Sequence, residues 1–209
     1  MAAPRVAFAL LCEGSSDEPL VEVLKRMLTW HGAGEALGLA DHATGTVRAK
    51  LARLVGAQSR FDVVFVHRDA DGRDAGPRIE EIRQAVAEVA PAMKHVPVVP
   101  VQMTEAWLLA DEAAIRRVVG NPRGTVPLDL PPLRHIEATP QPKQVLRQAL
   151  VVASEQSGRR RDQEKKAFNA RRRNLLLRLE PDGPIRQLPS WQRLDEDIAR
   201  FAESWHWTA

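Results

Sequence analysis

Acidic side chains follow two of the most apolar segments of the chain. Glu13 comes directly after the apolar run Val6–Cys12, and Asp69 and Asp71 follow a second run, Phe61–Val66. Carboxylate oxygens are the ligands that hard divalent cations such as Mg²⁺ prefer. A cation held in this way can activate water and offset charge on a phosphate. The spacing therefore predicts a metal-dependent phosphoryl-transfer site, if the two segments lie side by side.

Two further acids belong to the same candidate site. Asp17 lies about one helical turn beyond Glu13, and Glu105 follows a third apolar run, Val96–Val101. Two carboxylates about 4 Å apart repel by roughly 4 kcal/mol at an effective dielectric of 20. Either some of the acids are protonated or a cation neutralises them. We expect Asp17 to help hold metal, and Glu105 to assist a second ion or to position a water. Each of the two can equally be a helix cap.

Oxygen ligands alone favour particular metals at this site. The six histidines show no metal-ligand spacing, and the single cysteine cannot form a thiolate zinc site alone. Mg²⁺ or Mn²⁺ is therefore the expected ion rather than Zn²⁺.

The elements that must position these acids read as an α/β protein. In the three apolar runs, apolar residues do not alternate with polar ones. Such runs are typical of strands that are covered on both faces of a parallel sheet. The third run contains Pro97 and Pro100, so we expect it near a sheet edge. Segment 32–45 is rich in turn residues and leaves room for one short strand. Ligands of open parallel sheets gather beyond the carboxyl ends of the strands, where these acids lie.

Much of the remaining sequence has apolar residues at helical spacing. We predict a mostly parallel, Rossmann-like sheet flanked by helices in residues 1–119. A linker and a helical C-terminal extension packed on the sheet follow in residues 120–209, or the whole chain 1–209 is one domain. The predicted helices cover about 18–30, 46–58, 77–89, 104–110 with a continuation capped by Asp111 to Val119, 142–157, 161–178 and 190–205.

Positive charge is concentrated in one short segment. Residues 151–178 hold nine basic and three acidic side chains, whereas basic and acidic residues balance in residues 1–150. Such a segment is either a solvated helix face or a surface that contacts the phosphates of a nucleic acid. Phe168 is its only aromatic residue, so we expect backbone contacts rather than base stacking. The candidate contacts are Arg159, Arg160, Arg161, Lys165, Lys166, Arg171, Arg172 and Arg173.

Composition excludes a membrane protein. No run approaches the roughly 18 apolar residues that a membrane span needs. The apolar stretch near the N-terminus is too short for a signal peptide and runs into acidic residues. We therefore expect a cytoplasmic protein without a membrane partner.

The acidic motifs resemble those of the Toprim group, which includes topoisomerases, bacterial primases and the overcoming-lysogenization-defect nucleases. There a glutamate after the first strand and an Asp-x-Asp after a later strand hold Mg²⁺, which here implies Glu13, Asp69 and Asp71. The whole chain resembles, more specifically, the Toprim-like domain-of-unknown-function family 4276. The resembling stretches are Cys12-Glu13-Gly14, Arg68-Asp69-Ala70-Asp71, Glu105 to Asp111, Pro142-Lys143 and Pro189-Ser190-Trp191.

This resemblance implies a nuclease. It also implies an ATPase partner protein and a place in defence against mobile elements such as phages. The absence of tyrosine excludes DNA strand passage of the topoisomerase kind by this chain alone. Lys143 is a candidate catalytic contact to the phosphate, or else a solvated lysine at a helix start. Arg68 either clamps a phosphate oxygen or pairs with a structural acid.

Three functions remain open on the sequence. The first is metal-dependent phosphodiester hydrolysis of DNA or RNA. The second is Mg²⁺-dependent phosphoryl transfer on nucleotides or small phosphates. The third is a non-catalytic Toprim-like module that binds nucleic acid or a partner ATPase. The intact acid set favours the first two, and the basic segment favours a polymer over a nucleotide.

Overall fold

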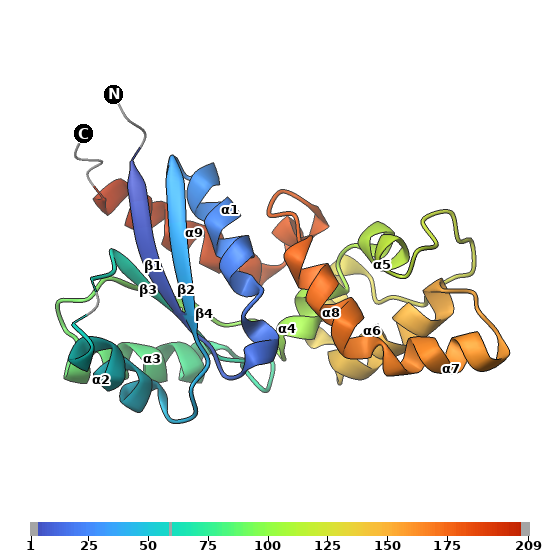
Figure 1. Cartoon of the computed structure of the whole chain (residues 1–209), viewed down its shortest axis with the longest axis horizontal. Coiled ribbons are helices and arrows are strands. Elements are labelled where there is room, and N and C mark those ends of the chain that lie inside the picture. Colours follow the sequence, from blue (N-terminus) through green and yellow to red (C-terminus); the bar gives the residue numbers. More distant parts are fainter. Residues whose placement is uncertain (1–3, 59, 206–209) are drawn as a thin grey trace.

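A computed structural model describes residues 4–58 and 60–205, and its main feature is an all-parallel sheet (Figure 1). Within these residues the sheet has four strands in the order β2-β1-β3-β4. The strands are β1 (Arg5–Leu11), β2 (Glu35–Asp41), β3 (Val63–His67) and β4 (His95–Val98). The helices are α1 (Leu20–Trp30), α2 (Val47–Gly56), α3 (Gly76–Val89), α4 (Thr104–Leu108), α5 (Glu112–Val118), α6 (Pro142–Ala153), α7 (Gly158–Lys166), α8 (Phe168–Leu177) and α9 (Pro189–Ser204).

The predicted α/β class is confirmed, and the three apolar runs are neighbours in the sheet. Leu11 of β1 is in register with Val66 of β3, and His67 of β3 with Val98 of β4. The strands that precede Glu13, Asp69 and Glu105 therefore end at the same edge. The prediction that the proline-containing run lies at an edge is also confirmed, because β4 is an outer strand. It is shorter than expected and ends before Pro100.

Side chains of the strands alternate between two cores. Phe8 and Phe65 point to the face covered by α1 and α9, where their rings meet edge to face at 5.3 Å. Leu11 and Val66 point to the opposite face, covered by α2 and α3. β1 and β3 are thus buried on both faces, which explains why they read as continuous apolar runs, whereas Leu37 and Leu39 of the edge strand β2 are exposed.

The C-terminal extension shares the first core. Its last helix, α9, returns to pack against α1 and β4, while α5, α6 and α7 project away from the sheet (Figure 1). Trp107 of α4 and Trp191 of α9 pack edge to face at 5.0 Å. The indole N–H of Trp107 donates to Ser190 Oγ at 2.8 Å. These contacts join the extension to the α/β part of the molecule.

The predicted helix 161–178 is wrong in one respect, because the chain forms two helices there. α7 ends at Lys166 and α8 begins at Phe168. α7 buries none of its side chains, whereas α8 buries Phe168, Leu175 and Leu176. α8 is therefore fixed by burial of its apolar side chains, whereas α7 has no such anchor, and the helix is interrupted at Ala167 between them.

Two other predictions concern a helix cap and a further strand. Asp111 caps α5 as predicted, since its Oδ1 accepts the N–H of Ala114 at 2.9 Å. The turn-rich segment 32–45 contains β2, the other edge strand. Among residues 4–58 and 60–205, no helix combines the length and the apolar character that crossing a membrane requires.

Candidate functional site

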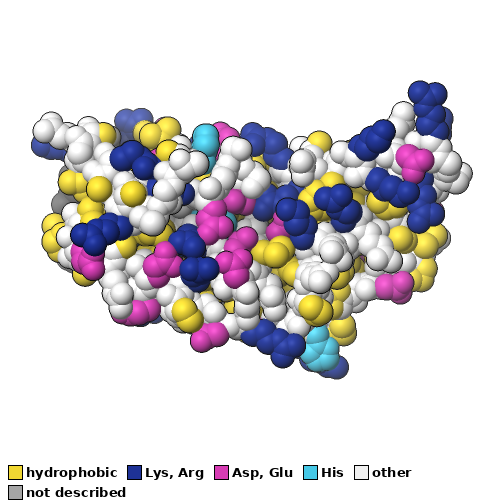
Figure 2. Space-filling view, turned by 90° about the horizontal axis from the view of Figure 1, so that it is seen from below, with side chains coloured by type: hydrophobic (Ala, Val, Ile, Leu, Met, Phe, Trp, Pro, Cys, Tyr) yellow, Lys and Arg dark blue, Asp and Glu magenta, His cyan; other side chains and the backbone are white. Residues whose placement is uncertain are grey.

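The loops that follow β1, β3 and β4 form the carboxyl edge of the sheet, which Figure 2 views from below. Acidic and basic side chains alternate near the middle of this face. Parallel pairing brings the strand ends together, so the three loops meet although they are distant in sequence.

The loop after β3 has an unusual backbone. Asp71 in this loop adopts a left-handed conformation with φ of 54°, and so does Gln102 in the loop after β4, with φ of 63°. The Asp71 N–H donates to Gln102 O, and the Gln102 N–H donates to Gly72 O. Non-glycine residues held in this region cost free energy and cluster at functional sites. The Asp-x-Asp motif therefore lies in a strained loop that is fastened to the loop after β4.

Arginines neutralise the predicted metal ligands in a chain of ion pairs. Arg68 Nε donates to Glu13 Oε1 at 2.5 Å, and Arg68 Nη1 donates to Glu81 Oε1 at 2.6 Å. Arg78 then bridges Glu81 and Asp71, at 3.0 Å each. Arg68 thus pairs with acids in this structure. Glu81 and Arg78 on α3 were not expected in the site, although their i,i+3 spacing signals a helical ion pair.

Asp69 is held by polar groups. Its Oδ1 accepts from the N–H of Thr104 at 2.9 Å and from the Thr104 hydroxyl at 3.0 Å. Burial tends to raise the pKa of Asp69, but His67 and the two Thr104 bonds outweigh it, so the pKa lies below its ordinary value. Asp69 is therefore an ionised carboxylate in a mostly buried position.

His67 lies beneath the carboxylates and is fully buried. Its Nε2 is 2.9 Å from Thr104 Oγ1 and 3.5 Å from Asp69 Oδ1, and its Nδ1 is 3.9 Å from Asp17 Oδ2. Burial lowers the pKa of His67, but the nearby carboxylates, Asp69 above all, raise it overall. His67 therefore lies under the edge as a buried group that contacts Thr104, Asp69 and Asp17.

Arg172 lies between two of the predicted site acids. Its Nε donates to Glu105 Oε1 at 2.9 Å and its Nη2 to Asp17 Oδ1 at 2.8 Å. Its Nη1 also donates to the carbonyl of Ser16. All three side chains are buried, and burial lowers the pKa of Arg172 less than the two carboxylates raise it. Arg172 therefore belongs to the acidic site and not to an exposed nucleic-acid face.

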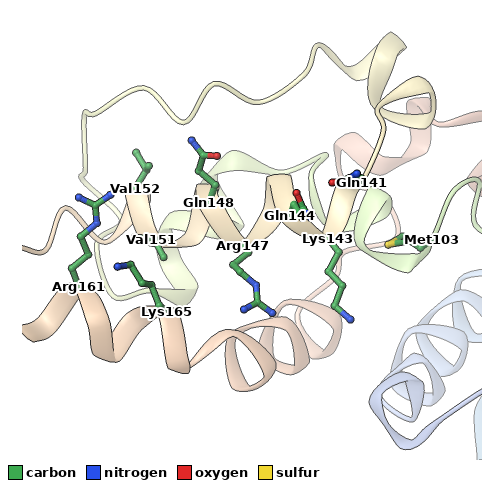
Figure 3. Close-up of a pocket in the computed structure, with 10 residues that line it drawn as sticks. All are labelled: Met103, Gln141, Lys143, Gln144, Arg147, Gln148, Val151, Val152, Arg161 and Lys165. Atoms are coloured by element: carbon green, nitrogen blue, oxygen red, sulfur yellow. The ribbon is translucent and has the colours of Figure 1, made fainter.

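The other predicted basic contacts divide into two groups. Arg171 is partly buried and donates to both carboxylate oxygens of Glu164 and to the carbonyl of Val118. The remaining ones are exposed: Arg159, Arg160, Arg161, Lys165, Lys166 and Arg173. Lys143, in the first turn of α6, lies in a separate groove between α6 and α7 (Figure 3) and does not line the pocket beside Glu13.

Lys50 of α2 is a candidate functional residue that the sequence interpretation missed. Its side chain is buried, and its ammonium donates to the carbonyl of Cys12 at 2.5 Å. It forms no ion pair with any residue in 4–58 or 60–205. A buried charge without an oppositely charged partner costs several kcal/mol. The sequence did contain a signal for this residue, because Lys50 lies on the apolar stripe of α2, beside Val47, Leu51 and Leu54.

A pocket of about 440 Å³ opens between Lys50 and the carboxyl edge. Its walls include Glu13, Arg68 and His67, together with Gly45 and Thr46 at the start of α2. Thr46 caps this helix by accepting the Ala49 N–H at 3.2 Å. A helix N-terminus beside two cations makes the far wall of the pocket favourable to an anion.

A divalent cation fits this edge in donor chemistry but not in the present spacing. Glu13 and Asp71 each use one oxygen for an arginine, and Asp69 uses one for Thr104. The second oxygen of each makes no hydrogen bond within the described part of the chain. Nevertheless, no three His, Cys, Asp or Glu side chains in that part are grouped closely enough to hold an ion. Arg68 would have to leave Glu13 before these carboxylates could share one.

Comparison of the chain with protein-family models, with curated proteins and with solved structures finds no match. The interpretation of the site therefore rests on its own residues and on the motifs quoted above.

Proposed function

We propose that this chain is a cytoplasmic, Mg²⁺- or Mn²⁺-dependent nuclease that hydrolyses phosphodiester bonds of DNA or RNA, similar to Toprim-like proteins. One observation carries the proposal. The buried ammonium of Lys50 has no acidic partner in the described residues and lines a pocket with Glu13 and Arg68. A phosphate in that pocket supplies the missing negative charge beside the expected metal ligands.

Each residue then has a distinct role. Lys50 and Arg68 bind the phosphate oxygens, and Arg68 exchanges its bond to Glu13 for one to the substrate. Glu13, Asp69 and Asp71 would hold the metal ion, which supplies an activated water and offsets charge on the phosphate. Thr104 keeps Asp69 oriented through two hydrogen bonds. Asp17 and Glu105 fix Arg172 beneath the site, so their role is to position rather than to ligate.

A second candidate function is a non-catalytic module that binds nucleic acid or an ATPase partner. It is favoured by the arginines that already neutralise Glu13, Glu81 and Asp71. In that case the edge needs no metal ion, and addition of Mg²⁺ produces no cleavage of any substrate.

Cleavage assays on Lys50→Met test the proposal. Plasmid, single-stranded DNA, RNA and nucleoside triphosphates are incubated with Mg²⁺ or Mn²⁺. Methionine fills the buried space without the charge, so the fold persists while phosphate binding is lost. We expect cleavage to fall about 100-fold or more, a magnitude typical of losing one electrostatic contact in an active site.

Lys25→Met is the matched control, because Lys25 lies on α1 and pairs with Glu22 outside the pocket. This variant keeps full activity. Cleavage that survives Lys50→Met unchanged contradicts the phosphate pocket, and hydrolysis confined to nucleoside triphosphates would favour a nucleotide-directed enzyme.

A further inference from the structure

A groove of about 840 Å³ runs between α6 and α7, on the part of the molecule that projects away from the sheet (Figure 3). Its apolar lining residues are Met103, Val151 and Val152, and the other residues that line it are polar or charged. Four cationic side chains line it: Lys143, Arg147, Arg161 and Lys165. Among residues 4–58 and 60–205, no acidic side chain lines it.

The cations form two rows with helical spacing. Lys143 and Arg147 are four residues apart on α6, and Arg161 and Lys165 are four apart on α7. All four are exposed. Within the described residues Lys143 and Arg161 make no ion pair, whereas Lys165 pairs with Asp162 at 2.9 Å. The groove therefore keeps positive charge that the protein itself does not neutralise.

Arg147 also covers the one aromatic ring nearby. Its guanidinium lies 4.5 Å from the ring centroid of Phe168, and the ring is buried. The face of Phe168 is therefore not available for a base to stack on. Gln144 and Gln148 line the same groove and present amides that donate and accept hydrogen bonds.

The groove leads toward the carboxyl edge. Met103 lies at the same end of it as Lys143 (Figure 3), and Met103 directly precedes Thr104. The backbone N–H of Thr104 donates to Asp69 Oδ1. One end of the cationic groove is thus a single residue away from a group that orients the Asp-x-Asp motif.

We propose that this groove binds one strand of nucleic acid through its phosphates and directs it to the carboxyl edge. The inference rests on the proposed function in taking nucleic acid as the ligand. The cations line a single groove of about 840 Å³ instead of a broad surface, which favours one extended strand over a duplex. Since the described residues that line the groove offer no open aromatic face, recognition is by charge and is largely independent of sequence.

Binding of a labelled single-stranded oligonucleotide to the full chain tests the inference, with fluorescence anisotropy as the readout. The assay is done in EDTA, so that no metal-dependent cleavage contributes. We compare wild type with the double variant Lys143→Gln, Arg161→Gln. We expect affinity at 50 mM salt to fall about tenfold or more. The slope of log K against log salt should fall by about 1.4, or roughly 0.7 for each lost contact.

The matched control is Arg60→Gln with Arg186→Gln, which removes the same charge from exposed positions outside the groove. Arg60 precedes β3 at the opposite edge of the sheet. The control should bind within twofold of wild type. An equal loss in both double variants would show that only net charge matters and would overturn the inference. So would tighter binding of a duplex or of polyglutamate than of the single strand.

The test is separable from that of the proposed function. Lys50→Met should retain oligonucleotide binding in EDTA while losing cleavage. A groove variant that binds normally overturns the inference even if the wild type is an active nuclease.

Discussion

The carboxyl edge of the sheet and the α6–α7 groove use charge in opposite ways. At the edge, every predicted metal ligand except Asp69 is paired with an arginine, and several of these groups are buried. In the groove the cations are exposed, and three of them, Lys143, Arg147 and Arg161, have no acidic partner in the described residues. Buried pairs hold a fixed geometry, whereas exposed unpaired charges attract a polyanion without fixing it. The arrangement at the edge suits chemistry on a single phosphate. The arrangement in the groove suits binding of many phosphates.

The largest effect that this comparison predicts is on stability, in the variant Arg172→Ala. Removal of the guanidinium leaves Glu105 buried without a partner in the described residues, and leaves Asp17 with only His67, 3.9 Å away. Breaking a buried pair in this way typically costs about 3–5 kcal/mol. Urea unfolding should show a loss of that order in the free energy of unfolding.

Arg173→Ala is the control for this experiment. Arg173 is the next residue, is exposed and lies 4.0 Å from Glu18. The free energy of unfolding should change by less than about 0.5 kcal/mol. If both variants unfold alike, the burial of Arg172 in the acidic site is contradicted.

A smaller effect is expected in the pH dependence of stability, measured without metal. The pKa of Asp69 is lowered, so its contribution is complete above its ordinary value of 3.8 and is lost as pH falls through the folded pKa. The pKa of His67 is raised, so its contribution is complete below 6.5 and is lost as pH rises through the folded pKa. The two together stabilise most between about pH 4 and 6.5.

Asp69→Asn sharpens that prediction. Without the carboxylate, the main group that raises the pKa of His67 is gone, while burial still lowers it. The decline in stability above pH 6.5 should therefore be smaller in the variant than in wild type. Parallel curves of unfolding free energy against pH would show that the two side chains are not coupled.

The smallest expected effect concerns Cys12, which lies directly before Glu13. Burial raises the pKa of its thiol to about 12, and the charge of Asp17 acts in the same direction. In the folded protein at pH 8, alkylation by iodoacetamide should be at least about 100-fold slower than in urea, because little thiolate is present. Rapid alkylation without urea would show that the edge opens readily to solvent.

The sequence was sufficient for three of the four strands of the described sheet and for the edge at which the acids lie. Continuous apolar runs marked β1 and β3, and prolines marked β4 as an edge strand. Asp111 was recognisable as a cap from its place before α5. These features depend on local patterns, which a single sequence contains.

Pairing between distant residues was not predictable in the same way. Arg172 meets Asp17 and Glu105 across separations of 155 and 67 residues. In the sequence Arg172 is one of three consecutive arginines. Only the direction of α8 determines which of the three is buried. Glu81 likewise became part of the site because α3 packs beside the loop after β3. Lys50 was the exception, since a lysine on an apolar helical stripe is visible in the sequence.

The most direct test of the account compares wild type with the double variant Asp69→Asn, Asp71→Asn. Cleavage of plasmid and RNA with Mg²⁺ and binding of Mn²⁺ by electron paramagnetic resonance are measured together. Asp74→Asn is the control, because Asp74 lies nearby and accepts the Gly76 N–H through one oxygen that asparagine retains. We predict that the double variant loses Mn²⁺ binding and at least about 100-fold in cleavage, while the control keeps both. Cleavage at the wild-type rate in the double variant would contradict the account.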